Sequence, residues 1–180
     1  TFVADPTGQF FWYNYAMAEV TLGGNPVHTS GELPAVGSAA PAFNLAAADL
    51  SSITSGDLVG KNVVLNIFPS VDTPTCANSV RTFNERAAGL SDTVVLCVSA
   101  DLPFAQGRFC GSEGIENVKT ASTFKSTFGA DYGVTLVDGK LEGILTRAVV
   151  VVGPDGNVKH TEMVSEIAQE PNYDAALGSI

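Results

Sequence analysis

Apolar runs alternate with helix-like patterns along most of the chain. Three runs, at residues 63–68, 93–99 and 147–152, are rich in valine and other apolar residues and contain few polar positions. Continuous apolar runs of this length are typical of central strands that are buried on both faces. The three runs therefore predict a core sheet that is covered by helices.

A helical pattern follows the first of these runs. Thr73 is a suitable N-cap, and Pro74 suits the first helical position, where a missing N–H costs little. The apolar residues that follow recur at a spacing of three or four and would form one buried face: Ala77, Val80, Phe83, Ala87 and Leu90. Gly89 lies near the expected end. The chain thus predicts a strand, a short turn and a helix in immediate succession.

Two hairpins are predicted at opposite ends of the chain. Residues 19–22 and 27–29 alternate between apolar and polar around a Gly-Gly-Asn-Pro turn, which indicates an N-terminal β-hairpin. Residues 158–163 follow the third apolar run across a Pro-Asp-Gly-Asn turn. The second hairpin would add an antiparallel strand to the core sheet.

The remaining helices are less regular. Residues 122–128 and 172–177 have helical patterns, whereas residues 107–114 contain three glycines, so that any helix there should be short or loosely held. The order of the elements favours an α/β protein with a central mixed sheet, flanking helices and an added N-terminal β-hairpin.

Cys76 is the first candidate for chemistry, because it falls in the first turn of the predicted helix. Unpaired backbone N–H groups, including those of Thr75 and Cys76, and the positive end of the helix dipole favour a thiolate there. A free cysteine is more commonly a small buried apolar residue. The helix-start position favours a reactive thiol over that alternative.

The surrounding residues resemble a known family. The spacing Pro69-x-x-x-Thr73-x-x-Cys76 is similar to the active-site signature of the peroxiredoxins. Longer strings resemble the thiol peroxidase branch, the atypical two-cysteine peroxiredoxins of bacteria: residues 65–73, 79–84, 99–106 and 107–114. The resemblance covers roughly residues 18–177 and implies a thioredoxin-like fold.

The resemblance also implies roles for five residues. Cys76 would be the peroxidatic cysteine, Thr73 would hydrogen-bond the thiolate and the peroxide, and Pro69 would shield the thiolate from water. Arg147 would supply fixed positive charge. Cys110 lies where the branch carries its resolving thiol, and it would attack the sulfenic acid on Cys76 to close a disulfide. No cofactor is implied.

Two arginines have other interpretations. An arginine at the edge of a strand is usually a solvated surface residue. Arg147, however, directly precedes a strongly apolar run and matches the arginine of the family. Arg81 lies five residues after Cys76, a spacing that turns it away from the thiol on a helix, so a structural role is expected for it.

Closure of a disulfide should require movement. A disulfide needs Cα atoms within about 7 Å, and Cys76 and Cys110 lie in separate predicted elements. We therefore expect oxidation to unfold the first turn around Cys76 and the glycine-rich segment around Cys110 locally.

Composition excludes several other classes. A chain of 180 residues that is 45% hydrophobic can bury a substantial core as one domain. A net charge of −10 argues against nucleic acid and anionic membranes as partners, and no apolar run is long enough to span a bilayer. The three cysteines include no Cys-x-x-Cys pair and have no ligand spacing for a metal. Cys97, in the middle of a strand, should be a spectator with a high pKa.

The first residues are unusual. Residues 1–16 are aromatic and contain no lysine or arginine, so they lack the basic region of a signal peptide. We expect this segment to be an extension or a remnant of expression cloning, and residues 17–180 to form the thioredoxin-like domain. A cytoplasmic location is expected.

The leading functional hypothesis is a thiol-dependent peroxidase. It would reduce hydrogen peroxide and organic hydroperoxides, with thioredoxin reducing the Cys76–Cys110 disulfide, and the resemblance implies a homodimer. One alternative is a peroxide sensor that passes its oxidation to a partner protein. Another is a thioredoxin-fold binding module in which Cys76 is inert.

Overall fold

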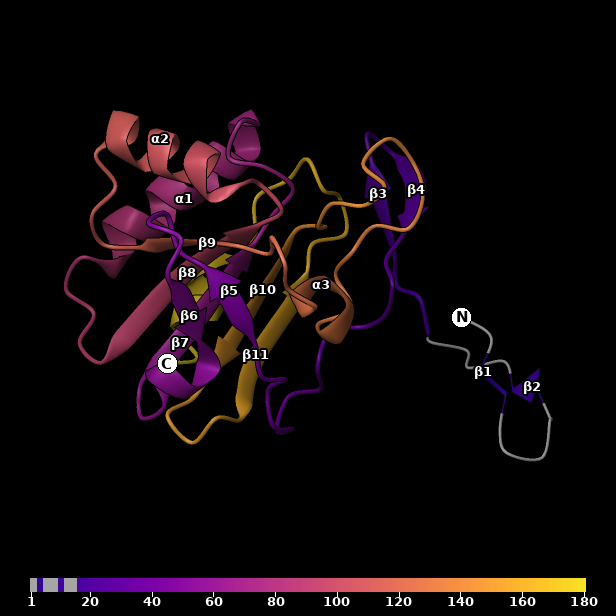
Figure 1. Ribbon diagram of the computed structural model, residues 1–180, viewed down its shortest axis with the longest axis horizontal. Coiled ribbons are helices and arrows are strands. Elements are labelled where there is room, and N and C mark those ends of the chain that lie inside the picture. The colour runs from indigo at the N-terminus through magenta and orange to yellow at the C-terminus, as the bar shows by residue number, and fades with distance from the viewer. Residues whose placement is uncertain (1–2, 5–9, 12–15) are drawn as a thin grey trace.

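The centre of the molecule is a seven-stranded mixed sheet, and the computed structural model describes residues 3–4, 10–11 and 16–180 (Figure 1). The strands, in order across the sheet, are β11 (Val158–Met163), β10 (Ala148–Val152), β7 (Asn62–Ile67), β8 (Thr93–Ser99), β9 (Lys119–Ser122), β5 (Asn44–Ala46) and β6 (Ser52–Thr54). β7, β8 and β9 are parallel, and the other pairs are antiparallel. The predicted mixed α/β sheet is confirmed.

Helical elements cover both faces of this sheet. They are η1 (Ser55–Leu58), α1 (Pro74–Ala87), α2 (Pro103–Glu113), α3 (Phe128–Asp131) and α4 (Tyr173–Leu177). Residues of α1, α2 and α4 pack on one face, and residues of η1 and α3 pack on the other. The helices predicted to start at Thr73 and near Asn172 are confirmed, with these two residues as the N-caps.

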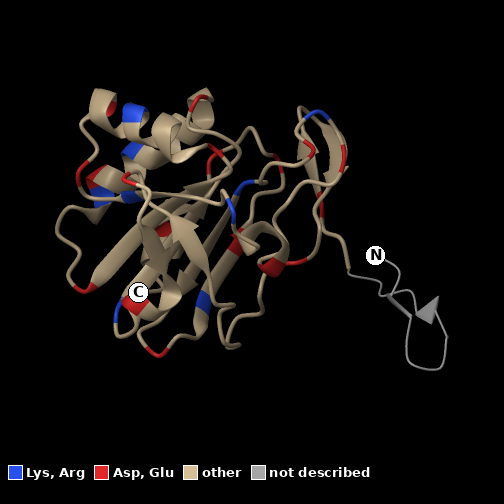
Figure 2. Ribbon diagram, in the orientation of Figure 1, with Lys and Arg blue, Asp and Glu red and all other residues tan. Residues whose placement is uncertain are grey.

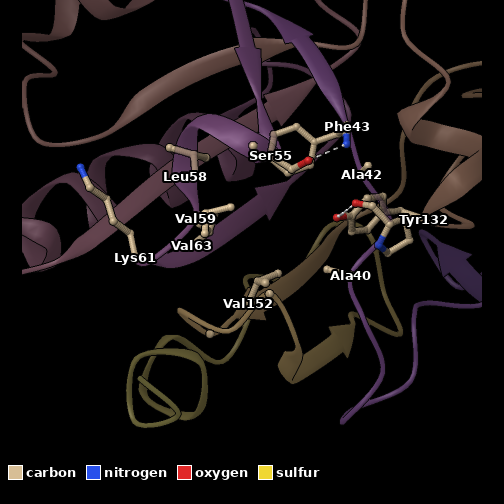
Figure 3. Close-up of a pocket in the computed structure, with 14 residues that line it drawn as sticks. Ala40, Ala42, Phe43, Ser55, Leu58, Val59, Lys61, Val63, Tyr132 and Val152 are labelled. Atoms are coloured by element: carbon tan, nitrogen blue, oxygen red, sulfur yellow. Dashed lines mark hydrogen bonds between the residues drawn. The ribbon is translucent and has the colours of Figure 1, made fainter.

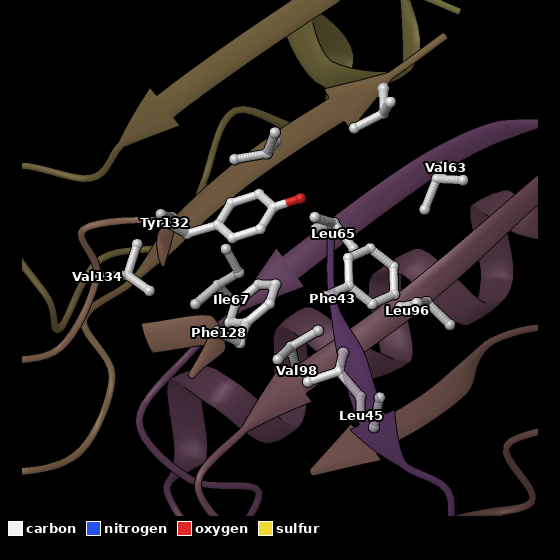
Figure 4. Packing of buried hydrophobic residues seen from close by; sticks show 14 of the residues in the cluster. Phe43, Leu45, Val63, Leu65, Ile67, Leu96, Val98, Phe128, Tyr132 and Val134 are labelled. Carbon is white, nitrogen blue, oxygen red and sulfur yellow. The ribbon is translucent and has the colours of Figure 1, made fainter. Parts of the chain in front are cut away.

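The alternation of side chains along β10 shows how the sheet is buried on both sides. Val149 and Val151 face the α1 side, whereas Ala148, Val150 and Val152 face the opposite core. In that opposite core, three aromatic rings from two segments pack over the strands (Figure 4): Phe43 before β5, and Phe128 and Tyr132 at the two ends of α3. A register slip of one residue would exchange the two faces of a strand. The burial of both faces therefore specifies the register in which the strands pair.

The N-terminal hairpin is confirmed, with a tighter turn than predicted. Its strands are β3 (Glu19–Leu22) and β4 (Asn25–His28), joined by Gly23 and Gly24 alone. Their φ angles of +60° and +79° fit a two-residue turn that requires left-handed backbone at both positions. Val20 and Val27 pack against Leu136 and Ile167, which attaches the hairpin to the rest of the domain.

The predicted extension lies mostly outside the described residues. Within it, the structure describes only β1 (Val3–Ala4) and β2 (Phe10–Phe11), which pair antiparallel, and Ala16. The expected domain boundary at residue 17 falls next to residues 12–15, which are outside the description.

The helix predicted at residues 122–128 is wrong. Ser122 ends β9, Lys125 has a φ of +63°, and α3 begins only at Phe128. The serine side chains explain the difference, because Ser122 Oγ accepts from the Phe124 N–H and Ser126 Oγ accepts from the Phe128 N–H. Such local bonds compete with helical hydrogen bonds.

The glycine-rich segment contains a longer helix than expected. α2 continues for 11 residues, through Gly107 and Gly111, and ends where Gly114 adopts a left-handed conformation. Gly107 lies against Ala48, and a Cβ added there would be 3.6 Å from the Ala48 Cβ, an ordinary contact distance. The helix is therefore not short, and the other expectation, that it is loosely held, stays a prediction.

Charged residues are spread over the molecule (Figure 2). Basic residues are few, and three of them form ion pairs with acidic partners: Arg81, Arg86 and Arg108. Among the described residues, no helix has the length and apolar character needed to cross a membrane.

Candidate active site

The thiol of Cys76 lies at the carboxyl end of the parallel strands. After β7 ends at Ile67, a short loop leads to Thr73, whose extended backbone (φ −108°, ψ 143°) makes it the N-cap of α1. Pro74 occupies the first helical position and Cys76 the third, as predicted. Cys76 is fully buried. Cys76 therefore lies buried in the first turn of a helix, where the backbone N–H groups have no partner within the helix.

Arg147 is the charged partner of this thiol. It directly precedes β10, which runs antiparallel to β7, so the start of β10 lies beside the end of β7. The side chain is only 1% exposed, and Arg147 Nη2 lies 3.2 Å from Cys76 Sγ. The contact places the positively charged guanidinium group beside the sulfur. The structure thus brings together two residues that the sequence separates by 71 positions.

The arginine is oriented by one backbone group. Arg147 Nε donates to the carbonyl oxygen of Ile167 at 2.8 Å. Its Nη1 is buried and has no hydrogen-bond partner among the described residues. A buried donor without a partner is costly, and it is available to an oxygen atom that enters the site.

Thr73 and Pro69 lie in the loop that leads to the thiol. Thr73 occupies the N-cap position, but its hydroxyl makes no cap bond and instead donates to the Ser70 carbonyl at 3.1 Å. Pro69 is buried, while Thr73 is exposed. The structure therefore places Thr73 at the start of α1 and Pro69 at the start of the loop, and it gives no hydrogen bond between Thr73 and the sulfur.

Asp101 fixes this loop and was not identified from the sequence. Its carboxylate accepts from Ser70 Oγ at 2.7 Å, from the Val71 N–H at 2.8 Å and from Ser99 Oγ at 2.7 Å. An acidic residue just after a parallel strand lies at the same sheet edge as the loop after the neighbouring strand. That position was the signal that could have identified it.

A buried polar chain lies beneath the first turn. Ser79 Oγ donates to the Cys76 carbonyl at 2.8 Å, and Asn66 Nδ2 donates to Ser79 Oγ at 3.2 Å and to Cys97 Sγ at 3.6 Å. Burial raises the pKa of Cys97 to about 12. The pKa of the Cys97 thiol thus agrees with the spectator role predicted for it. Asn66, a polar residue inside an apolar strand, was the sequence signal that could have identified this series of hydrogen-bonded side chains.

Cys110 has different surroundings. It lies in the third turn of α2, is half-buried, and its thiol contacts Thr120 Oγ1 at 3.8 Å. Burial raises the pKa of Cys110, although the contact with Thr120 opposes the shift. All three cysteines are free. Cys110 in this conformation is therefore a weak nucleophile, because little of it is thiolate at neutral pH.

The two thiols proposed to react do not meet in this conformation. α1 and α2 both start beyond the carboxyl ends of neighbouring parallel strands. With a rise of about 1.5 Å per residue, Cys76 lies about 3 Å and Cys110 about 10 Å along its helix. Adjacent helices are also about 8–10 Å apart. The Cα separation therefore exceeds the limit of about 7 Å for a disulfide.

Surface polar contacts hold α2 in place. Arg81 Nε pairs with Glu113 Oε2 at 2.7 Å, which agrees with the structural role expected for Arg81. Arg108 pairs with Asp72 at 3.2 Å, so α2 is tied to the loop before Cys76 as well as to α1. Asn84 Oδ1 also accepts hydrogen bonds from the N–H groups of residues 116 and 117, at 3.1 and 2.7 Å.

An apolar pocket lies elsewhere in the molecule (Figure 3). Its lining includes Phe43, Leu58, Val63, Tyr132 and Val152, which belong to the core on the side of the sheet opposite α1. Val63 is near the start of β7 and Val152 is at the end of β10, so the pocket is at the opposite end of these strands from Cys76. It does not belong to the thiol site. Among the described residues, no three His, Cys, Asp or Glu side chains come together as a metal site requires.

Comparisons with known proteins show which family the chain belongs to. The Redoxin family model matches residues 35–177. The chain belongs to the redoxin family. A thiol peroxidase from Mycobacterium bovis is 65% identical over 164 residues, which are 91% of this chain and 99% of that protein. A thiol peroxidase from Corynebacterium glutamicum is 54% identical over 91% of this chain and 99% of its own length.

A solved structure has the same fold as this chain. The crystal structure of a peroxiredoxin-like protein from Aquifex aeolicus matches this redoxin with a TM-score of 0.85 and 41% identity, covering 90% of this chain and 95% of that one. The resemblance to thiol peroxidases and the thioredoxin-like fold, both drawn from the sequence, are confirmed.

Proposed function

We propose that this redoxin is a thiol-dependent peroxidase that reduces hydrogen peroxide and organic hydroperoxides. The contact of 3.2 Å between Arg147 Nη2 and the buried Cys76 sulfur is the observation that carries the proposal. The Cys76 thiolate attacks the terminal oxygen of the hydroperoxide and breaks the O–O bond. The cysteine becomes a sulfenic acid, and the leaving oxygen takes a proton and departs as water or an alcohol.

The neighbouring groups suit this displacement. The buried Nη1 of Arg147 has no partner among the described residues, and it can donate to a peroxide oxygen as negative charge develops there. The Thr73 hydroxyl can donate a hydrogen bond to the peroxide once it no longer donates to the Ser70 carbonyl. Pro69, which is buried and has no N–H, limits water near the thiolate.

Cys110 then resolves the sulfenic acid. Its sulfur attacks the Cys76 sulfur, a disulfide forms, and the hydroxyl of the sulfenic acid leaves as water. Because the two cysteines do not meet in the folded conformation, this step requires local unfolding of the first turn of α1 and of the part of α2 around Cys110. Exposure also removes the burial that raises the pKa of Cys110. A thioredoxin reduces the disulfide and restores both thiols.

The proposed partners follow from this cycle. They are a hydroperoxide, a thioredoxin and a second copy of the chain. The proposal of a homodimer is supported by three exposed apolar side chains near the start of α2, namely Leu102, Phe104 and Phe124, and sedimentation of the reduced protein tests it. The proposed location is the cytoplasm, where free thiols stay reduced.

Peptide mapping by mass spectrometry tests the proposed cycle. Reduced protein is treated with one equivalent of hydrogen peroxide, and the remaining thiols are alkylated. We expect a Cys76–Cys110 disulfide with Cys97 alkylated. Cys110→Ser should instead accumulate the Cys76 sulfenic acid, and Cys76→Ser should leave the peroxide unconsumed. Three alkylated cysteines in the parent protein, with the peroxide intact, would contradict the proposed function.

A further inference from the structure

The segment after β11 lies between α1 and the N-terminal hairpin (Figure 1). On the α1 side, two successive carbonyl groups of this segment serve the active site. The Ile167 carbonyl accepts from Arg147 Nε at 2.8 Å, and the Ala168 carbonyl accepts from Thr75 Oγ1 at 3.1 Å. The position of these two carbonyls therefore determines where the guanidinium and the first turn of α1 lie relative to each other.

On the hairpin side, one carboxylate holds the same segment. Glu166 Oε1 accepts from the N–H groups of Gly23 and Ala168 at 3.1 and 3.0 Å. Glu166 Oε2 accepts from Thr21 Oγ1 and from the Gly24 N–H at 2.8 and 3.0 Å. These four donors lower the pKa of Glu166 to about 2, so that the carboxylate is charged at neutral pH.

The turn of the hairpin is shaped to receive a carboxylate. Gly23 and Gly24 are both left-handed, and their consecutive N–H groups both bond to the oxygens of Glu166. An added Cβ at either glycine would have nothing within 4 Å, so the backbone conformation and not the available space requires glycine. Consecutive N–H groups that converge in this way form a small anion site.

The backbone adds a second attachment at the same place. The Thr21 N–H donates to the Ser165 carbonyl at 2.7 Å, and the Ile167 N–H donates to the Thr21 carbonyl at 2.8 Å. The side chain of Ile167 is 2% exposed and packs with Val20 and Val27 of the hairpin. Ile167 thus presents its carbonyl to Arg147 while its N–H and side chain are held by the hairpin.

We propose that Glu166 is a positioning residue for the reaction at Cys76. Its carboxylate binds the hairpin turn and thereby fixes the Ile167 carbonyl, which orients the Arg147 guanidinium against the sulfur. The proposal rests on the proposed role of Arg147. A displacement of about 1 Å at a reacting group can slow a reaction about 100-fold. Glu166 can therefore affect the reaction rate through Ile167 and Arg147 without touching the substrate.

The hairpin contains a matched control for this anchor. Asp138 is also a carboxylate that binds the hairpin, through the His28 N–H at 2.8 Å and His28 Nδ1 at 2.7 Å. It holds β4, however, and has no hydrogen bond to the segment from Glu166 to Ala168 in the described structure. Loss of hairpin stability alone should therefore affect Asp138 and Glu166 variants alike, whereas loss of positioning should affect only Glu166 variants.

The experiment compares Glu166→Ala, Glu166→Gln and Asp138→Asn with the parent, at a temperature where circular dichroism shows all four folded. The readouts are the rate constant for hydrogen peroxide with reduced Cys76 and the pH profile of Cys76 alkylation. We expect Glu166→Ala to react about tenfold more slowly and to require a higher pH for alkylation. Glu166→Gln should be slowed about threefold, because it keeps the two bonds to Oε1 but presents an N–H to the Gly24 N–H. Asp138→Asn should stay within about twofold of the parent.

A double-mutant cycle separates the possible failures. In an Arg147→Ala background, Glu166→Ala should slow the reaction by less than about twofold, since the group that Glu166 orients is absent. Additive slowing, or equal slowing by Asp138→Asn, would overturn the positioning role. A Glu166→Ala protein as fast as the parent, with Arg147→Ala slow, would overturn it too and leave the proposed function intact. If Arg147→Ala alone were as fast as the parent, the proposed role of Arg147 would fail, and the positioning role with it.

Discussion

Cys76 and Cys110 lie on neighbouring helices, but their surroundings differ in burial, charge and backbone support. Cys76 is fully buried against a guanidinium, in a helix that contains no glycine. Cys110 is half-buried, has an uncharged hydroxyl as its contact, and belongs to a helix with two internal glycines. The comparison indicates that the thiol proposed to react with the peroxide is held in place in the folded protein, whereas the proposed resolving thiol belongs to a segment that can unfold at low cost.

The contacts that hold α2 point to the same division of roles. In the ion pair of Arg81 with Glu113, the side chains are 43% and 32% exposed, and in the pair of Arg108 with Asp72 they are 67% and 61% exposed. Exposed pairs of this kind contribute about 0–1 kcal/mol each. They define where α2 lies when folded without adding much to the free energy of opening it.

The largest expected effect concerns Cys97. This thiol is buried in a strand, so it shows the effect of burial on reactivity apart from the effect of a mobile helix. It is as buried as Cys76 but has no cationic partner among the residues that the structure describes, and its pKa is raised to about 12. At pH 8 its thiolate fraction is therefore about 10³-fold below that of an ordinary cysteine. We expect Cys97 in folded protein to be alkylated at least about 10³-fold more slowly than in urea, as measured by mass spectrometry of timed samples. Alkylation of Cys97 at the rate of Cys110 would contradict the comparison.

The next effect concerns the charge at the Cys76 site. Arg147→Ala removes the guanidinium, and we expect the reaction of Cys76 with hydrogen peroxide to slow about 10²–10³-fold, as is typical when a donor to developing negative charge is lost. Arg147→Lys should recover only part of this, because one ammonium cannot reproduce the fork that bonds both the sulfur and the Ile167 carbonyl. Rates from competition with a reference peroxidase measure both variants. Alkylation of Cys110 should not change, and an equal loss there would show that the substitution had merely loosened the fold.

The smallest effect concerns the backbone of α2. Gly111→Ala places a methyl group where nothing lies within 4 Å, so it should stabilise the helix by about 0.5–1 kcal/mol. If local unfolding limits disulfide formation, that step should slow about two- to fivefold, with the peroxide reaction unchanged. Gly114→Ala is the matched control, because a side chain at its φ of +64° is strained and should weaken the helix end and speed the same step. Rapid-quench mass spectrometry measures both, and a shift of both rates in one direction would contradict this role of α2.

The parts of the fold that could be predicted from the sequence are those that a local pattern of apolar residues or a helix cap determines. The strands around Leu65, Leu96 and Val150 are apolar on both faces, and the N-cap and first position of α1 follow from Thr73 and Pro74. These preferences are local, so the sequence alone was enough to place Cys76 in the first turn.

Features that depend on distant partners were beyond local reasoning. Residues 122–128 were expected to be helical, but the side chains of Ser122 and Ser126 bond to nearby backbone groups, which a periodic apolar pattern does not reveal. Asp101 and Glu166 act through neighbours from other elements, at sequence separations of about 30 and 140 residues. Arg147 was identified through the family resemblance. The distance between its guanidinium and the Cys76 sulfur could be known only from the folded structure.

The antiparallel course of β10 has a consequence for the newly made chain. Arg147 follows Cys76 by 71 residues, and the Ile167 carbonyl that orients it comes later still. At a synthesis rate of about 5–20 residues per second, Cys76 exists for roughly 4–14 s before its cation has been made. Even then, the pair forms only when β10 docks beside β7, a long-range pairing that comes slowly in folding. The nascent chain thus carries an ordinary thiol, which acquires its cation only when the domain closes.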